Sequence, residues 1–280
     1  MSIRVAKSAG FCFGVSRAVE LVEQAAQAGK KVATLGPIIH NRHVVEKFEK
    51  MGVRVIRTPE EALPEETVII RSHGVSRGVY ERLERQNVEI IDATCPFVKR
   101  IHTIVSRAEE EGRLPVIIGT PTHPEVEGIA GWCSDCRVFA GPDDLENWAQ
   151  SGDIPKDSAI CIVSQTTSTE SLWKMCCEIA KKQFTNLKIF DTICRATEYR
   201  QSEAAELSEV SHAMVVVGDP KSSNTGRLAM ICREHCDKVF LVDNAAALSA
   251  LSALSPLRPA RRLRRRSGPR SRLARSITVP

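Results

Sequence analysis

The sequence predicts an α/β protein with three small α/β lobes, whose parallel-type sheets are arranged around a pseudo-threefold axis. Three segments share one plan: a short β-rich run, a cysteine, an amphipathic helical stretch, and a second apolar run that ends in glycine. The spacing from cysteine to glycine is the same each time, from Cys12 to Gly36, from Cys95 to Gly119 and from Cys194 to Gly218. Strand–helix–strand units of this length are typical of parallel sheets with crossover helices.

The repeat divides the chain into a first α/β lobe at residues 1–94, a second at 95–193, a truncated third lobe at 194–255 and an arginine-rich disordered tail at 256–280. The first two lobes each contain a later strand that runs into polar residues, at 68–74 and at 160–167. Open α/β sheets bind ligands at the carboxyl ends of their strands, so we expect a ligand site there. The third lobe has the tail where such a strand is expected, and the tail lacks the apolar run of a parallel core strand.

The composition argues against a membrane, secreted or nucleic-acid-binding protein. The chain has 280 residues, 42% of them apolar, and no apolar run approaches the ~20 residues that span a bilayer. The N-terminus lacks a secretory signal pattern, so a cytoplasmic protein is expected. Nine arginines follow Asp243, and without them 30 basic residues stand against 34 acidic ones. No nucleic-acid partner is therefore expected unless the arginine-rich tail is genuine.

Three of the ten cysteines, Cys12, Cys95 and Cys194, hold equivalent places in the repeat and are expected to meet near its axis. Three thiolates suit either a zinc ion with one open position or an iron–sulfur cluster with one iron that lacks a protein thiolate, and spacing alone does not decide between them. Apolar neighbours would exclude water and favour a redox cluster; they are Phe11, Phe13, Pro96 and Phe97.

A second set of cysteines, Cys133 and Cys136, has the spacing of half a zinc site or of a redox pair. No second half of a zinc site is evident, so we interpret them as incidental loop cysteines. Cys161 lies in an apolar run and is expected in the core.

A polar side chain follows each repeat glycine by four residues: His40, His123 and Ser222. Each precedes a predicted helix, and helix N-termini attract phosphate through their free N–H groups and positive dipole ends. Together with His73, Thr166, Ser223 and Asn224, these residues would make a pocket suited to a diphosphate. Glu125 is the one carboxylate placed directly at these loops, which makes it a candidate proton donor.

These residues resemble the 4-hydroxy-3-methylbut-2-enyl diphosphate reductase family, which completes the non-mevalonate isoprenoid pathway. The matching motifs follow the family order and cover about residues 3–248. They are Gly10-Phe-Cys12-Phe-Gly14-Val, Leu35-Gly-Pro-Ile-Ile-His40-Asn41, Arg71-Ser-His73-Gly74, Asp92-Ala-Thr-Cys95-Pro96, His123-Pro-Glu125-Val, Ser164-Gln-Thr166-Thr167 and Ser222-Ser-Asn224-Thr. Several are short, but jointly they are highly specific.

The resemblance implies one [4Fe–4S] cluster per chain, held by Cys12, Cys95 and Cys194, with the substrate's allylic oxygen at the remaining iron. It implies Glu125 as proton donor and Thr166 near the reacting end of the substrate. The diphosphate of this small allylic substrate would contact His40, His73, His123, Ser222, Ser223 and Asn224. The family removes the hydroxyl with two electrons and two protons, giving isopentenyl and dimethylallyl diphosphates, and takes the electrons from an external donor such as ferredoxin or flavodoxin.

The resemblance stops at about Ser249, where the family normally closes with a strand and a Thr-Ala-Gly-Ala-Ser-like loop. We interpret this aberrant C-terminus as out-of-frame or otherwise altered sequence that impairs catalysis; a rival interpretation is a basic arm for RNA or anionic membrane. Two other functions stay open. One is a degenerate, non-catalytic metal-binding protein of the same fold, and the other is a zinc-dependent phosphate-ester hydrolase.

Overall fold

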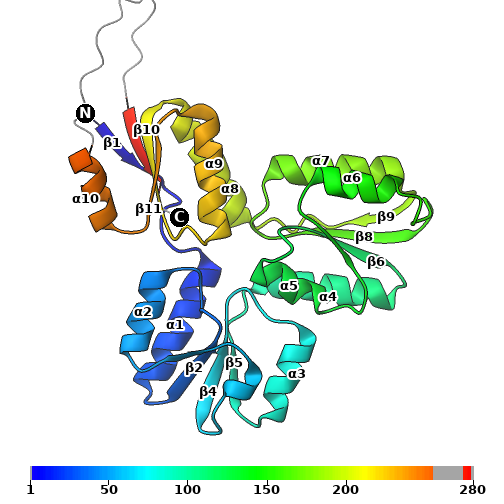
Figure 1. Cartoon of the computed structure of the whole chain (residues 1–280), viewed down its shortest axis with the longest axis horizontal. Helices are drawn as coiled ribbons and strands as arrows, with labels where there is room; N and C mark the ends of the chain where they lie inside the picture. Colours follow the sequence, from blue (N-terminus) through cyan, green and yellow to red (C-terminus); the bar gives the residue numbers. More distant parts are fainter. Residues whose placement is uncertain (1, 255–273, 279–280) are drawn as a thin grey trace, which may run out of the picture. The chain divides into compact units, whose positions relative to one another are not determined.

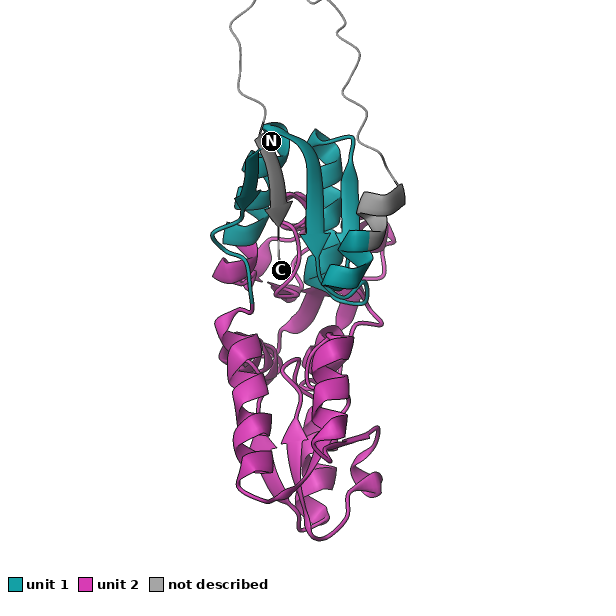
Figure 2. Cartoon of the chain, turned by 90° about the vertical axis from the view of Figure 1, so that its left-hand side faces the viewer, with its two compact units in different colours: residues 1–10, 199–280 teal, residues 11–198 magenta. Residues whose placement is uncertain are grey.

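The computed structural model describes residues 2–254 and 274–278, whose strands form three separate four-stranded sheets in which every pair is parallel (Figure 1). The chain divides into two compact units. Phe11–Glu198 holds two of the sheets, and Met1–Gly10 with Tyr199–Pro280 holds the third (Figure 2). The expected α/β class with parallel sheets in separate lobes is confirmed.

The first lobe of Phe11–Glu198 has the strand order β3-β2-β4-β5. Its elements are α1 (Phe13–Gln27), β2 (Lys31–Leu35), α2 (Arg42–Lys50), β3 (Arg54–Ile56), the 3-10 helix η1 (Pro59–Glu61), β4 (Glu66–Ile70), α3 (Arg77–Arg85) and β5 (Glu89–Asp92). One face of the sheet packs on α1 and α2, where Ile69 meets Val22 and Phe48; the other packs on α3, where Ile70 meets Leu83. Both faces are covered, as an all-parallel sheet requires.

The second lobe repeats this order as β7-β6-β8-β9. Its elements are α4 (Pro96–Glu110), β6 (Leu114–Ile118), α5 (Pro124–Ala130), β7 (Arg137–Phe139), α6 (Pro142–Gln150), β8 (Ala159–Ser164), α7 (Glu170–Gln183) and β9 (Asn186–Ile189). Helices α6 and α7 cover one face and α4 and α5 the other (Figure 1). Cys161 lies in the core on β8, as expected.

The third sheet has the order β11-β10-β12-β1, which matches the other two position by position. Its unit contains β1 (Ser2–Val5), most of α8 (Arg195–Glu209), β10 (Ser211–Val217), α9 (Ser223–His235), β11 (Val239–Val242), α10 (Ala245–Leu254) and β12 (Ala274–Thr278). Its core gathers Ala204 of α8 and Leu228 of α9 against Met214 and Val216 of β10.

The observed sheets differ from the expected division of the chain in two places. Strand β1, expected in the first lobe at 1–94, pairs with β12 in the third sheet. The tail expected to be disordered contains β12, which pairs with both β10 and β1, so Ala274–Thr278 occupies the central position that we expected to be missing. The rest of the tail, 255–273 and 279–280, lies outside the described residues.

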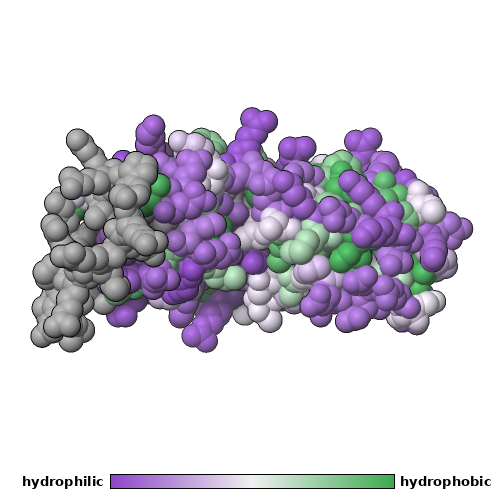
Figure 3. Space-filling model, turned by 90° about the horizontal axis from the view of Figure 1, so that it is seen from above, coloured by the Kyte–Doolittle hydropathy of each residue, from purple (hydrophilic) through white to green (hydrophobic). Residues whose placement is uncertain are grey.

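The molecular surface is mostly hydrophilic, because most apolar side chains face inward. Hydrophilic side chains cover most of the face seen in Figure 3, with a limited apolar patch among them. Among residues 2–254 and 274–278, no helix has the length and apolar character that crossing a membrane demands.

Candidate functional site

The three repeat cysteines each stand just before a helix. Cys12 and Cys95 are the N-cap residues of α1 and α4, and Cys194 directly precedes α8. Two of them are fixed through the backbone to the loop after a central strand: the Cys95 N–H donates to the Ser72 carbonyl and the Cys194 N–H to the Thr166 carbonyl, both at 3.0 Å. The repeat therefore ties each of these sulfur atoms to the loop that carries polar candidate residues.

The sulfur atoms of Cys12, Cys95 and Cys194 lie close enough for their charges to interact. Burial is the main cause that raises the pKa of the Cys95 thiol, and the neighbouring Cys12 and Cys194 raise it further. Burial likewise raises the pKa of Cys194. Nearby helix N–H groups oppose this rise in pKa because they favour the thiolate; they belong to Phe97 and Val98 for Cys95 and to Ala196 and Thr197 for Cys194. A helix N-terminus favours the thiolate that binds metals.

Gly14 leaves the space in which the Cys95 sulfur lies. A Cβ atom on Gly14 would be 2.6 Å from Sγ of Cys95, so a side chain would displace the sulfur. Three converging thiols, two of them beside the N–H groups of a helix N-terminus, and this glycine fit a cluster held by thiolates. One expectation is wrong: Phe11, Phe13 and Phe97 are 47%, 66% and 44% exposed and do not seal the site from water.

Three histidines from three different loops meet beside one another. His40 follows β2, His73 follows β4, and His123 caps α5. Their ring centroids are 4.5 Å apart for His40–His73 and 5.6 Å for each of the other two pairs, and one nitrogen from each lies within 4.8 Å of the others. This spacing suits an anion with several oxygens, and it also suits a metal ion.

The histidines differ in how they are held. The Glu125 N–H donates to Nδ1 of His123 at 3.1 Å, so a neutral His123 ring carries its proton on Nε2, where it can donate to a ligand. His73 has Nδ1 buried with no hydrogen-bond partner among the described residues. Burial lowers the pKa of His73 well below its usual value, and His40, His123 and Arg71 lower it further. A bound anion would reverse that shift.

Glu125 and Thr166 form a buried pair. The Thr166 N–H donates to Oε1 of Glu125 at 2.6 Å and the Thr166 hydroxyl to Oε2 at 2.8 Å. Burial raises the pKa of Glu125 although these two hydrogen bonds oppose the shift. The Glu125 charge also acts on the Cys194 thiol. Glu125, whose raised pKa favours the protonated carboxyl group, thus lies close to Cys194 of the three converging cysteines.

Ser222, Ser223 and Asn224 belong to the other compact unit. Ser222 is the N-cap of α9, and its hydroxyl accepts from the Thr225 N–H at 3.4 Å. Oδ1 of Asn224 is buried and has no hydrogen-bond partner among the described residues. An unused acceptor at a helix N-terminus is consistent with a ligand-binding loop, but a shared site with the three histidines remains a prediction.

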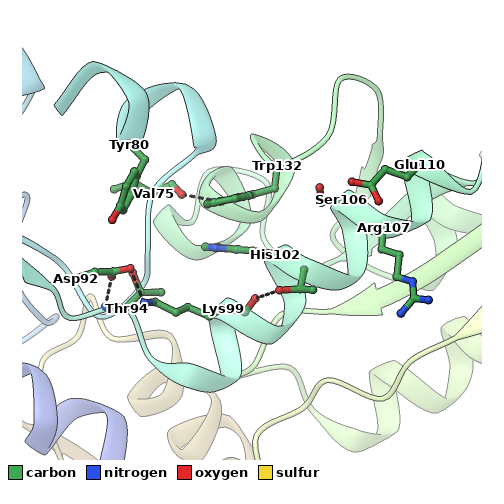
Figure 4. Close-up of a pocket in the computed structure, with 11 residues that line it drawn as sticks. Val75, Tyr80, Asp92, Thr94, Lys99, His102, Ser106, Arg107, Glu110 and Trp132 are labelled. Atoms are coloured by element: carbon green, nitrogen blue, oxygen red, sulfur yellow. Dashed lines mark hydrogen bonds and ion pairs between the residues drawn. The ribbon is translucent and has the colours of Figure 1, made fainter. Parts of the chain in front are cut away.

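Sequence reasoning missed a cavity of about 500 Å³ between the first two lobes (Figure 4). Its lining includes none of the three clustered histidines; instead His102 and Trp132 stack within it, 5.0 Å apart with 16° between the ring planes. Nε2 of His102 has no hydrogen-bond partner among the described residues. No local sequence signal marks the cavity, because its walls come from separate segments.

Comparison with known proteins identifies the family of the chain. The profile of the LytB protein family matches residues 3–258. The chain belongs to the LytB family. A LytB-family relative from Thermoanaerobacter sp. (strain X514), named 4-hydroxy-3-methylbut-2-enyl diphosphate reductase, is 42% identical over 253 residues, which cover 89% of this chain and 86% of the relative.

Two solved structures are similar to this LytB-family chain. The E-1-hydroxy-2-methyl-but-2-enyl-4-diphosphate reductase from Plasmodium falciparum matches with a TM-score of 0.86 over 99% of this chain and 82% of that one; at 23% identity it supports the fold alone. A structure of (E)-4-hydroxy-3-methyl-but-2-enyl diphosphate reductase, the terminal enzyme of the non-mevalonate pathway, is 31% identical, with a TM-score of 0.67 over 100% of this chain and 93% of that one.

Proposed function

We propose that this chain is an iron–sulfur reductase that converts 4-hydroxy-3-methylbut-2-enyl diphosphate to isopentenyl and dimethylallyl diphosphates. The observation that carries the proposal is the meeting of Cys12, Cys95 and Cys194 beside the buried carboxyl group of Glu125. A protein thiolate site next to a proton-holding acid is what the removal of a hydroxyl group by electrons and protons requires. The names of the relatives support the same reaction.

Cys12, Cys95 and Cys194 would hold one [4Fe–4S] cluster. When bound, the cluster would supply electrons one at a time and a Lewis-acidic iron. The overall reaction balances as an allylic alcohol plus two electrons and two protons giving an alkene and water. Each turnover consumes two electrons, so the proposal includes an external one-electron donor of the ferredoxin or flavodoxin class.

The histidine cluster would bind the diphosphate and so fix the position of the allyl group. Nε2–H of His123 is oriented by the hydrogen bond to its Nδ1, and His73 would gain a proton as the anion approaches. Ser222, Ser223 and Asn224 would add neutral donors from the other unit. Anchoring the charged end converts binding energy into correct placement of the reacting end.

Glu125 would deliver the proton. Its raised pKa keeps the carboxyl protonated to a higher pH than an exposed glutamate, and Thr166 fixes both of its oxygen atoms. A carboxyl group held in one orientation transfers its proton along one direction, toward the substrate that the histidines position.

Anaerobic purification followed by iron and sulfide analysis tests the proposal. We expect a brown protein with about four iron atoms per chain, turnover of the substrate with a chemical one-electron reductant, and loss of both in Cys194→Ser. Cys232→Ser, which changes a buried cysteine of α9, should keep its iron. A colourless zinc protein would favour the phosphate-ester hydrolase, and a brown protein without turnover would favour the non-catalytic alternative.

A further inference from the structure

The exposure of the ten cysteines separates them into two groups of five. Cys161, Cys176, Cys177, Cys232 and Cys236 are buried, whereas Cys12, Cys95, Cys133, Cys136 and Cys194 are partly exposed. Three of the exposed group converge at the site described above. The other two, Cys133 and Cys136, lie in one loop, close enough for each thiol to shift the pKa of the other. Their contact is therefore a second accessible thiol centre.

The loop between α5 and β7 is built to hold these two thiols together. The Glu109 carboxylate, which comes from α4, accepts hydrogen bonds from both the N–H and the hydroxyl of Ser134, each at 2.5 Å. Asp135 forms an ion pair with Arg137, and the Cys133 N–H donates to the Ala130 carbonyl at 3.4 Å. The residues beside the two cysteines are thus held by hydrogen bonds and an ion pair, which keeps both thiols in one short loop.

The two sulfur atoms are not equivalent. The Cys133 thiol donates to the Ala130 carbonyl at 3.4 Å, which favours its protonated form. The neighbouring Cys136 and burial both raise the pKa of Cys133. The neighbouring Cys133 and Arg137 lower the pKa of the Cys136 thiol, against burial and the charge of Asp135. A thiolate is the nucleophile in thiol oxidation and exchange, so Cys136 is the attacking sulfur and Cys133 the resolving one.

We infer that Cys133 and Cys136 form a reversible disulfide and make this loop a redox modification site. With a peroxide as oxidant, the Cys136 thiolate attacks one oxygen, the O–O bond breaks, and Cys136 becomes a sulfenic acid as water leaves. The Cys133 thiol then attacks that sulfur, the S–O bond breaks, and a second water leaves. Two thiols and one hydrogen peroxide thus give one disulfide and two waters, and a dithiol reductant reverses the change.

The disulfide would form at one end of a short helix whose other end carries site residues. Helix α5 has His123 as its N-cap and Glu125 in its first turn, and the cysteine loop follows its last residue. At about 1.5 Å per residue, seven residues span roughly 10 Å. Trp132 lies next to Cys133; its indole N–H donates to the Val75 carbonyl at 2.9 Å, as the dashed line in Figure 4 shows. Trp132 is therefore a natural reporter of the loop.

The test follows the covalent state of the loop in the full chain, so it does not depend on the proposed reductase activity. The anaerobically purified protein is treated with hydrogen peroxide at about one equivalent, alkylated, and mapped by peptide mass spectrometry. We expect a Cys133–Cys136 disulfide to form before any other cysteine is modified and to disappear with dithiothreitol. A change in tryptophan fluorescence should accompany it and be absent in Trp132→Phe, which keeps Trp148 and Trp173.

Two serine variants test the assigned roles of the sulfur atoms. In Cys133→Ser, a sulfenic acid should accumulate at Cys136 and react with dimedone; in Cys136→Ser, Cys133 should stay reduced, and Cys176→Ser should behave like the wild type. The inference is overturned if the wild-type Cys133 and Cys136 remain reduced while other cysteines oxidise. It is overturned equally if the oxidised pair is joined to different partners.

Discussion

The two sheets of Phe11–Glu198 and the sheet of the other unit share one strand order but differ in the strand at their centre. In β4 all five residues are buried, and in β8 five of six are. The corresponding β12 has the sequence Ala-Arg-Ser-Ile-Thr. Central strands of parallel sheets are normally apolar on both faces. Backbone pairing can thus repeat a topology three times although the apolar runs at residues 68–70 of β4 and 160–163 of β8 have no equivalent in the sequence of β12.

The candidate site residues are also distributed unevenly between the sheets of Phe11–Glu198 and the sheet of the other unit. The loops after β2, β4, β6 and β8 carry His40, His73, His123 and Thr166, each at the end of a well-buried strand. The third sheet offers only the loop before α9, where Oδ1 of Asn224 has no partner among the described residues. Under the proposed function, the proton donor would lie where the core holds the loops most firmly, and the third lobe would contribute binding.

The largest expected effect is on kcat, when the proposed proton donor Glu125 is replaced. Glu125→Gln keeps the size of the side chain and one oxygen that can accept from the Thr166 N–H, while its amide NH2 would donate to the Thr166 hydroxyl. Because the amide has no acidic proton to deliver, kcat should fall by about 10²–10⁴-fold with a smaller change in KM. In the wild type, kcat should fall as pH rises through the raised pKa of Glu125, because the acid must be protonated. Steady-state kinetics over a pH series measures both.

Two further variants complete this comparison. Glu127→Gln, on the same helix but exposed, should leave kcat unchanged. Ser223→Ala in the other unit should raise KM more than it lowers kcat. A Glu125→Gln enzyme with kcat within tenfold of the wild type would contradict the proton-donor role, and a Ser223→Ala enzyme that loses kcat alone would contradict the division between the units.

The next effect tests whether β12 is a true central strand. Ser276 pairs with Arg4 on one side and with Met214 on the other. Ser276→Pro removes a ladder N–H and should destabilise this sheet by about 3 kcal/mol. Hydrogen exchange followed by mass spectrometry should show faster exchange in β10 and unchanged exchange in β4 and β8. Ser276→Thr, which keeps the N–H, is the control; unchanged β10 exchange in the proline variant would exclude β12 from the sheet.

Much of the fold could be predicted because the repeat is local. The fixed interval from each cysteine to its glycine and the apolar runs of β2, β6 and β10 were enough for three parallel lobes. Strand pairing across the chain was not predictable in this way. Four-residue β1 has no pattern that tells which sheet it joins, and β12 lacks the apolar run that marks a central strand, so β1 was assigned to the first lobe and β12 was missed.

The candidate site could likewise be predicted only where the repeat is local. The equivalent positions of Cys12, Cys95 and Cys194 in the repeat predicted that they converge, but the sequence could not show that Gly14 lies against Cys95, since that contact joins distant segments. The apolar character of Phe11, Phe13 and Phe97 also misled us, because composition beside a cysteine does not determine whether a side chain is covered.

A smaller effect concerns the buried His102 of α4. Burial lowers its pKa to about 4 from an ordinary 6.5, with Lys99 acting in the same direction and Asp92 opposing it. As the pH falls, the unfolded chain therefore binds a proton at His102 before the folded chain does. The stabilisation from a neutral His102 is fully present above pH 6.5, and its loss should lower the free energy of unfolding by about 2 kcal/mol between pH 7 and pH 5.

Urea unfolding at several pH values measures this contribution. His102→Gln should remove that part of the slope, whereas His212→Gln, at an exposed position on β10, should keep it. Equal slopes for the wild type and His102→Gln would show that His102 is accessible to protons in the folded state.

The smallest effect compares two helical glycines, one in each unit. A Cβ on Gly14 would meet Sγ of Cys95 at 2.6 Å, whereas a Cβ on Gly226 in α9 has no heavy atom within 4 Å. Alanine favours a helix over glycine by about 1 kcal/mol, so neither variant should lower the stability of the cluster-free protein, where the Cys95 side chain can turn aside. With the cluster bound the sulfur is fixed, and Gly14→Ala should release iron to a chelator on the order of tenfold faster than Gly226→Ala. Equal release from the two variants would mean that the Cys95 sulfur does not lie against Gly14 in the loaded protein, and the assignment of Cys95 as a ligand would lose its structural support.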